Sequence, residues 1–282
     1  MTNEMIMNLW ENFFTQDSWL NVINTFPDKY LDERSIEIEY SKIDDFSSEL
    51  SDYYLNDAKK TLELAEKKVR ELLPPDLENK ANIIINVRII NLPKLNCECK
   101  IRELRNEHLN KATSIKGIVR RAVHVRPRII DAKYKCERCY RLIEEKQNRF
   151  YLQEPQCCHK EQGGCGRSSA STRFKLQENK SKKIDTQKIE IQELSEGLPI
   201  GSQPQRLVVY LDDDLTGIVN PGNKIIVNGY CSTTEELMKN RKTSATLNLY
   251  FVANSIEIEE KGFEDINLTE LDVKKIKELS LN

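Results

Sequence analysis

The sequence contains no long hydrophobic run. No stretch of about 18 apolar residues occurs, so we expect no helix that crosses a membrane. A secretory signal peptide needs a basic start and an apolar core, whereas Glu4 and Glu11 interrupt the first fourteen residues. We therefore expect a soluble intracellular protein, cytoplasmic or at the nucleoid, with no membrane partner.

Glycine is also scarce, with only 10 in 282 residues, and no glycine-rich phosphate-binding loop occurs. The segment Gly222-Asn-Lys224 comes nearest to a Walker A motif, but it lacks both the leading glycine and the following hydroxyl residue. No G-x-G-x-x-G or G-x-S-x-G motif occurs either, and the three histidines form no evident nucleophile–base pair. These absences predict that this chain carries no enzyme active site.

Aromatic residues make up only 7% of the chain, so stacking platforms for unpaired bases are not evident. Charge is distributed unevenly although its total is only −2. Residues 1–99 carry a net charge of −8, residues 100–150 carry +9 and residues 151–282 carry −3. A basic block inside an acidic chain is a candidate footprint for phosphate, with a solvated basic face as the equal alternative. Backbone electrostatics would dominate any binding of nucleic acid.

The first third of the sequence has helical periodicity. Leu9, Phe13 and Phe14 share one helical face, with Trp10 beside them, and Asp57 can cap a second helix. The apolar residues of this second helix recur at steps of three and four: Ala58, Leu62, Ala65, Val69 and Leu72. Pro74 ends the helix, and the alternation over residues 35–40 indicates a short strand between the two helices.

From about residue 82 the pattern changes to strands separated by glycine and proline. The expected strands are 83–90, 115–123, 128–134, 188–194, 206–211, 224–229 and 246–258. This arrangement favours a Greek-key barrel over a parallel α/β sheet. The predicted fold class is α+β and mainly β, with an N-terminal helical subdomain and an OB-type barrel.

Clustered cysteines in a reduced intracellular chain favour metal binding over disulfides. Cys136 and Cys139 form a C-x2-C knuckle, and a second group of cysteines follows about twenty residues later. Cys157, Cys158 and His159 compete for the third ligand position. We favour a four-cysteine zinc site made of Cys136, Cys139, Cys158 and Cys165, with Cys157 as the alternative third ligand.

The predicted zinc is structural. A four-thiolate site is closed to water, and a zinc deaminase would need H-x-E before P-C-x-x-C, whereas His159-Lys-Glu161 follows the knuckle. Cys97, Cys99 and Cys231 are interpreted as free thiols.

Two groups of basic residues are candidate DNA contacts. The first group flanks strand-like residues and would suit a phosphate backbone: Arg120, Arg121, Arg126 and Arg128. Lys239, Arg241 and Lys242 lie at the polar tip between two strand-like arms, which predicts a basic hairpin near residues 232–246. Ordinary exposed charges that confer solubility are the alternative for both groups.

Several segments, in the right order, resemble the N-terminal part of minichromosome maintenance (MCM) replicative helicases, and the archaeal members most. They are residues 101–111, 114–121, 125–128, 133–139, 187–194, 201, 204–206, 211–215 and 221–222. The resemblance implies a ribbon inserted in the barrel and a homo-oligomer, as a hexamer, double hexamer or filament, whose hairpins point toward DNA. It also implies that Gln192, Glu193, Gly201 and Gln205 belong to a loop that communicates with an ATPase part.

The expected domains follow from this resemblance. They are a helical subdomain (1–82), the first part of the barrel (83–133), a zinc ribbon (134–178), the second part of the barrel (179–262) and a linker (263–282). The linker would lead to an AAA+ ATPase domain that this sequence lacks, so we expect a truncated chain that binds DNA and assembles without hydrolysing ATP.

Two other functions fit the same residues. One is an RNA-binding protein with a zinc ribbon and an OB barrel, which would prefer RNA to DNA of equal sequence. The other is an assembly scaffold whose DNA binding is incidental and independent of the basic residues.

Overall fold

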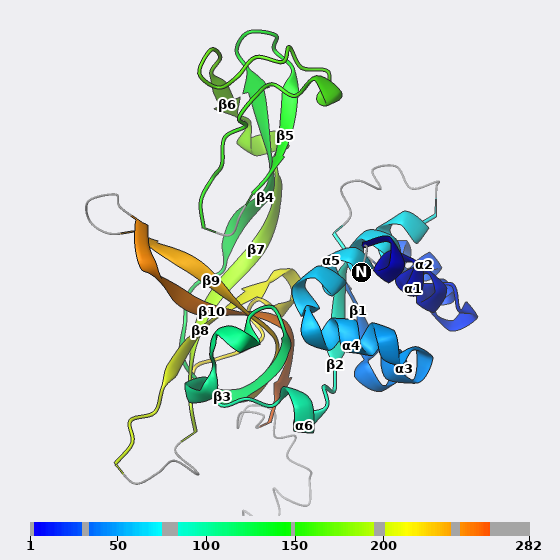
Figure 1. Ribbon diagram of the computed structural model, residues 1–282, viewed down its shortest axis with the longest axis vertical. Helices are drawn as coiled ribbons and strands as arrows, with labels where there is room; N and C mark the ends of the chain where they lie inside the picture. Colours follow the sequence, from blue (N-terminus) through cyan, green and yellow to red (C-terminus); the bar gives the residue numbers. More distant parts are fainter. Residues whose placement is uncertain are drawn as a thin grey trace, which may run out of the picture.

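The computed structural model describes residues 3–29, 34–74, 84–147, 150–194, 201–237 and 243–259. Its N-terminal part packs helices against two short strands (Figure 1). The elements are α1 (Asn3–Phe14), α2 (Asp17–Lys29), β1 (Ser35–Glu39), α3 (Tyr40–Phe46), α4 (Ser48–Asn56), α5 (Ala58–Leu72) and β2 (Asn86–Ile90). The capped helix predicted after Asp57 is α5, because the Asp57 side chain accepts a hydrogen bond from the backbone N–H of Lys60.

Aromatic packing organises the core of this helical part. Trp10 is fully buried, stacks on Phe14 at a centroid distance of 5.2 Å and meets Phe13 edge-on. Trp10 therefore lies at the centre of the buried face, whereas Leu9 is only partly buried at its margin.

Strand β2 does not join the barrel, so the expected start of the barrel at residue 83 is wrong. It pairs in parallel with β1, and its side chains Val87 and Ile89 lie in the helical core. Its other edge meets β10 (Thr243–Ile258) at a bulge, where Asn254 accepts from Ile89 N–H and donates to the Val87 carbonyl. The β-branched run was read correctly as a strand, but its partner lies outside the sheet that follows in sequence.

The barrel consists of β3 (Ala112–Ala122), β7 (Lys182–Gln192), β8 (Arg206–Asp212), β9 (Lys224–Leu237) and β10. The pairing order β3–β9–β10–β8–β7 closes into a ring because β3 also pairs with β7. All these pairs are antiparallel except β8 with β10. This five-stranded Greek-key ring confirms the OB-type barrel and the mixed, mainly β fold class.

Gly229 permits the close approach of two barrel strands. A Cβ atom at this position would lie 2.0 Å from the Val252 carbonyl oxygen of β10. Only glycine leaves room for that carbonyl, so the barrel wall depends on this residue at this point of β9.

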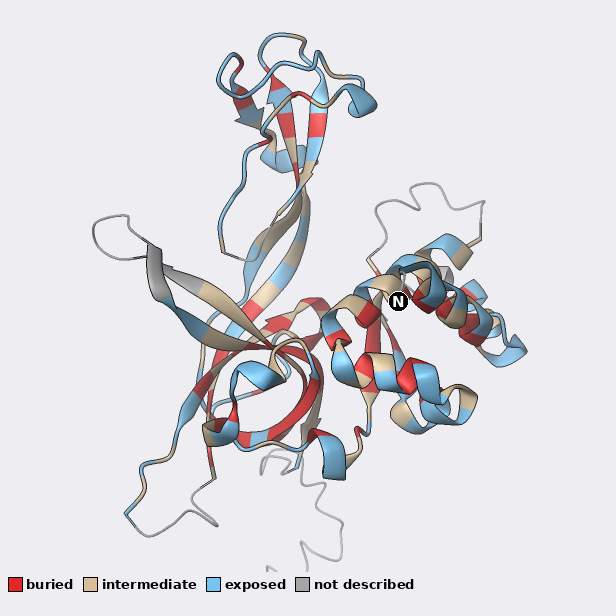
Figure 2. Ribbon diagram, in the orientation of Figure 1, coloured by how far each residue is buried: buried red, intermediate tan, exposed pale blue. Residues whose placement is uncertain are grey.

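The ribbon is inserted between β3 and β7. Strand β4 (Arg126–Cys136) continues along the same edge of β7 that β3 occupies and then leaves the barrel. It pairs at its far end with β5 (Leu142–Lys146) and β6 (Phe174–Leu176). Figure 1 shows this stem rising away from the barrel, with the helical part beside the barrel and the β9–β10 arms projecting from it. Burial is densest in the barrel and between the helices (Figure 2).

Short elements complete the connections. They are α6 (Lys94–Cys97), η2 (Ile101–Glu103), η3 (Asn106–His108), η4 (Lys160–Gln162), η5 (Glu178–Lys180) and η6 (Asp213–Leu215).

Candidate metal centre and nucleic-acid interface

Two turns at the end of the ribbon bring four cysteines together. The first turn follows β4, where Tyr140 N–H donates to the Cys136 carbonyl and Cys136 N–H donates to the Arg141 carbonyl. The second contains Cys158, whose Sγ accepts from the backbone N–H of Cys165 at 3.3 Å. Gly164 is required here, because a Cβ would lie 2.5 Å from the Cys158 Sγ. Each turn thus presents two thiols to the other.

The thiols of Cys136, Cys139, Cys158 and Cys165 all lie within 4.8 Å of one another. Tetrahedral zinc with bonds of about 2.3 Å places its sulfur ligands about 3.8 Å apart, so this cluster fits a metal ion. The Sγ atoms of Cys139 and Cys158 are 3.5 Å apart, far beyond the length of about 2.05 Å in a disulfide. The donor set is therefore suited to a closed four-thiolate site.

Cys157 lies outside this cluster. Its Sγ contacts His159 Nδ1 at 3.6 Å, and the other ring nitrogen of His159 lies 3.7 Å from a Glu145 carboxylate oxygen. The two residues that compete with Cys158 in sequence therefore contact each other and not the four thiols.

The thiols of the cluster differ in acidity. A hydrogen bond from the Arg141 backbone N–H is the largest cause that lowers the pKa of Cys139, to about 6. Burial raises the pKa of the Cys158 thiol to about 12. Negative charge in the cluster therefore resides first on Cys139, and a bound cation would favour the thiolate form of the other ligands.

The hydrophobic core of the ribbon is small. It comprises Ala132, Tyr134, Cys136, Ile143, Cys158 and Phe174. Two of these residues are members of the thiol cluster, so a metal would stabilise the ribbon where apolar burial is limited.

The arginines predicted to contact DNA lie where the barrel meets the stem. Arg120 and Arg121 are both exposed although they are consecutive in β3, because the pairing of β3 with β7 shifts register between Val119 and Arg121. Arg126 is exposed at the start of β4. Arg121 pairs with Glu190 and Arg126 with Thr186, so the arginines follow one edge of β7 over roughly 13 Å.

Arg128, two residues further along β4, has a structural contact instead. Its guanidinium lies 3.1 Å from one carboxylate oxygen of Asp212. The other oxygen of this carboxylate accepts a hydrogen bond from the Thr186 hydroxyl. Lys239, Arg241 and Lys242 lie outside the described residues, between the described ends of β9 and β10.

Glu193 anchors the predicted communication loop at its base. It is 5% exposed, and its carboxylate accepts from the backbone N–H groups of Arg102 and Gln205. The Arg102 guanidinium donates to both carboxylate oxygens, at 2.9 to 3.2 Å. Burial would raise the pKa of Glu193, but these hydrogen bonds outweigh it and hold the pKa below the ordinary value.

The other predicted residues of this loop lie close to that anchor. Gln192 ends β7 opposite Ile118, and Gln205 also accepts from Glu193 N–H through its carbonyl. Gly201 has a φ of +84°, which favours glycine. Residues 195–200 lie outside the described part of the chain.

The fold assembles an aromatic cluster that the sequence does not predict. Phe150, Tyr210 and Tyr250 pack edge to face with centroid distances of 5.1 to 5.6 Å. They come from three separate segments, so neither spacing nor overall composition indicates that they meet. Alternation within β8 and β10 was the only available signal.

No helix among the described residues is long and apolar enough to span a membrane.

Comparisons with known proteins agree with this architecture. Residues 100–235 match the family model of the MCM OB domain. The minichromosome maintenance protein MCM of Saccharolobus solfataricus is 29% identical over 255 residues, which are 88% of this chain and 36% of that protein. DNA replication licensing factor MCM6 of Oryza sativa subsp. indica is 27% identical over 185 residues, 66% of this chain and 21% of that protein.

A solved structure extends the likeness to nearly the whole chain. The 1.8 Å crystal structure of the N-terminal domain of an archaeal MCM has a TM-score of 0.77 and 27% identity. The match covers 92% of this chain and all of that chain. This chain therefore spans about a third of the archaeal relative's length and a complete N-terminal domain of known structure.

Proposed function

We propose that this chain, an N-terminal domain of the archaeal MCM family, is the DNA-binding and ring-assembly module of a replicative DNA helicase. One observation carries the proposal: an OB barrel with a cysteine-rich ribbon inserted after its first strand presents exposed arginines at the junction of the two. The module is non-catalytic. The ATP-dependent helicase activity belongs to the remainder of a full-length protein, which acts inside the cell at the chromosome.

DNA binding rests on backbone electrostatics. Arg120, Arg121 and Arg126 lie along one strand edge, where guanidinium groups can contact successive phosphates. Lys239, Arg241 and Lys242 supply a second set of cations at the hairpin. Phosphate contacts carry little sequence information, so affinity for single strands is strongly salt-dependent and tolerant of sequence.

Cys136, Cys139, Cys158 and Cys165 hold one structural zinc ion. The ion fixes the end of the ribbon, which projects from the barrel and is free to contact a second ring. The chain assembles as a homo-oligomer, and the segment between Gln192 and Gln205 connects this module to the ATPase part.

The primary test is solution mass by light scattering, with and without single-stranded DNA, at low and moderate salt. We expect a ring-sized particle that binds DNA and releases it as salt rises. A particle whose mass does not change when DNA is added, at either salt concentration, would contradict the DNA-binding part of the proposal.

The hairpin is tested by the triple variant Lys239→Ala, Arg241→Ala and Lys242→Ala. Removing three phosphate contacts should reduce the slope of log K against log salt by about 2 for single strands. Lys94→Ala serves as the control, because Lys94 is an exposed lysine on α6 outside both basic groups, and it should leave the slope unchanged.

Competition between RNA and DNA of equal sequence separates the helicase module from an RNA-binding protein, which would favour RNA.

A further inference from the structure

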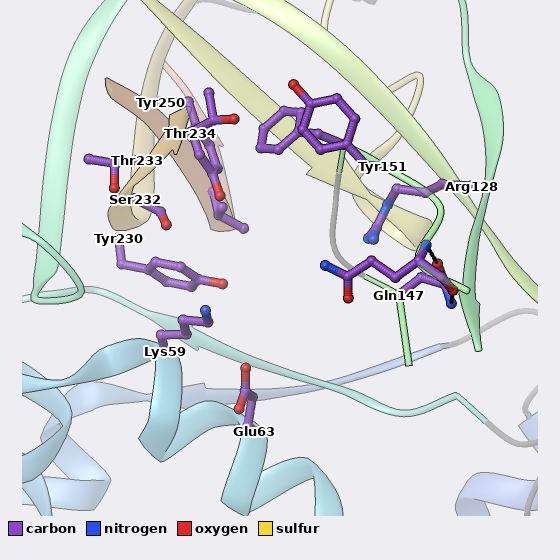
Figure 3. A pocket seen from close by; sticks show the side chains of 13 residues that line it. Lys59, Glu63, Arg128, Gln147, Tyr151, Tyr230, Ser232, Thr233, Thr234 and Tyr250 are labelled. Carbon is purple, nitrogen blue, oxygen red and sulfur yellow. Dashed lines mark hydrogen bonds between the residues drawn. The ribbon is translucent and has the colours of Figure 1, made fainter. Parts of the chain in front are cut away.

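A pocket lies where the three parts of the molecule meet. Its volume is about 580 Å³, within the usual range for ligand pockets. Helix α5 forms one wall, the stem and the segment after β5 form another, and strands β9 and β10 form the third (Figure 3). This pocket is separate from the thiol cluster and from the exposed arginines described above.

Aromatic rings dominate one side of the pocket. Phe150 and Tyr250 hold each other edge to face at a centroid distance of 5.1 Å, and Tyr210 braces both from behind. Tyr151 is 45% exposed at the rim, and Tyr230 lies on the wall nearer α5 (Figure 3). Exposed aromatic surface held in fixed positions suits a flat, apolar ring system.

Two hydrogen bonds link the described residues on either side of Tyr151. Gln147 donates through its side-chain amide to the Gln153 carbonyl at 3.0 Å and accepts from Gln153 N–H at 2.6 Å. These two bonds hold the loop ends on either side of Tyr151 together.

Polar groups line the rest of the pocket. Arg128 is held in position by Asp212, and Lys59 reaches in from α5 (Figure 3). Ser232, Thr233 and Thr234 add hydroxyl groups from β9. Glu63 supplies the only carboxylate among the described lining residues, so this donor set does not suit a divalent cation.

We propose that this pocket receives one nucleotide, with its base against the Tyr151 and Tyr250 rings and its phosphate facing Lys59 and Arg128. The inference rests on the proposed function and deepens it: the module contacts an unstacked base as well as the phosphate backbone. Ser232–Thr234 and Tyr250 lie on the two strands that lead to the basic hairpin. Single-stranded DNA bound along the described arms of β9 and β10 therefore comes within reach of the pocket.

The test compares a thymidine single strand with an abasic strand of equal length, using fluorescence anisotropy and labelled strands. Tyr151→Ala should lower the affinity for the thymidine strand about tenfold and leave the affinity for the abasic strand unchanged, because stacking requires a base. Tyr151→Phe keeps the ring and should retain binding. Leu152→Ala is the matched control, since Leu152 is the exposed neighbour of Tyr151 and does not line the pocket.

Free thymidine monophosphate forms the second arm and identifies the source of the nucleotide. If the wild-type protein binds the monophosphate and Tyr151→Ala does not, the pocket is supported with a free nucleotide as its occupant. If Tyr151→Ala lowers only the affinity for the thymidine strand, the pocket is supported with a nucleotide of a DNA strand as its occupant.

Other outcomes overturn the pocket. Equal weakening of the thymidine and abasic strands would mean that Tyr151 acts on the backbone and not on a base. If the wild-type protein binds both strands and Tyr151→Ala binds them with the same affinities, the pocket proposal is overturned and the proposed function stands. Failure of the wild-type protein to bind either strand or the monophosphate would overturn both.

Discussion

Glu193 connects the end of β7 to Arg102 in η2, on the segment that precedes β3. Its partner Arg102 is 26% exposed at the side chain, whereas Glu193 is 6% exposed, so the pair lies at the edge of the interior. Charge-assisted hydrogen bonds at such sites are stronger than neutral ones. Because residues 192 and 205 flank the same carboxylate, Glu193 fixes both ends of the predicted communication loop.

Glu193→Gln should lower the free energy of unfolding by about 2 kcal/mol at pH 7, since Arg102 loses its charged acceptor. The folded state depresses the pKa of Glu193 below its ordinary value of 4.5. Its stabilisation is therefore present above pH 4.5 and is lost as pH falls through the folded pKa, so the difference between variant and wild type should shrink there. Urea unfolding between pH 7 and pH 3 measures this.

Glu190→Gln is the matched control for Glu193→Gln. Glu190 lies three residues earlier and pairs at 3.2 Å with Arg206, whose side chain is 59% exposed. An exposed pair contributes less than about 1 kcal/mol. A loss at Glu190 equal to that at Glu193 would refute the anchoring role.

Residue chemistry was predictable where it depends on spacing. The thiols of Cys136, Cys139, Cys158 and Cys165 were selected from the sequence, and the structure brings them together. Glu193 was named only through the family resemblance, because nothing local to it indicates Arg102, 91 positions away. The Phe150 cluster was missed for the same reason.

At the scale of elements, the helix after Asp57 and the strands of the barrel follow from periodicity. Helices α2, α3 and α4 were not predicted individually: α3 and α4 have only 7 and 9 residues, whereas α2 has 13 and carries an apolar face that was not recognised. Strand β2 was recognised, but its assignment to the barrel was wrong. Periodicity identifies a strand but not its partners, and β2 pairs with β1 and meets the distant β10 through the Asn254 side chain.

The ribbon should depend on metal through one of two adjacent cysteines. Cys158→Ser should abolish stoichiometric zinc, because Cys158 Sγ lies in the thiol cluster, whereas Cys157→Ser should retain it. Elemental analysis of both purified variants measures this. We also expect a chelator to increase amide exchange in β5 and β6 and to leave β9 unchanged, since the ribbon and the barrel have separate cores.

Equal zinc loss in the two cysteine variants would contradict the assignment of Cys158. If Cys158→Ser retains zinc and Cys157→Ser loses it, the third ligand is Cys157, the alternative that the sequence left open.

At the scale of the whole molecule, three consecutive aspartates join the helical part to the barrel. Asp213 accepts from Arg34 at 2.8 Å and from Asn86 at 2.8 Å. Asp214 accepts from Arg88 and Asn86. Asp213 adopts a φ of +56°, which aspartate tolerates better than most residues, and this turns its carboxylate toward the helical part. The acidic triplet is visible in the sequence, but its three partners are not.

Arg88 makes the attachment sensitive to a single charge. Its side chain is 8% exposed, and it also donates to the Asp212 carbonyl. Arg88 would keep this hydrogen bond and its attraction to Glu66, so the loss of the Asp214 charge should cost less than about 3–5 kcal/mol, the cost of a buried charge left without any partner. The hydrogen bonds of Asn254 and Ser255 to β2 would then hold the two parts together with the remaining contacts of Asp213 to Arg34 and Asn86.

Asp214→Asn should therefore loosen the helical part without unfolding the barrel. We expect faster amide exchange in β2, where Ile89 N–H depends on Asn254, and unchanged exchange in β9. Glu178→Gln is the control, because Glu178 is exposed on η5 and lies outside the strands that meet the triplet. Equal exchange in β2 for Asp214→Asn and wild type would mean that Asn254, Ser255 and the Asp213 contacts suffice. Faster exchange in β2 and β9 together would mean instead that the two parts unfold as one unit, so that the triplet stabilises the fold and does not act as a local attachment.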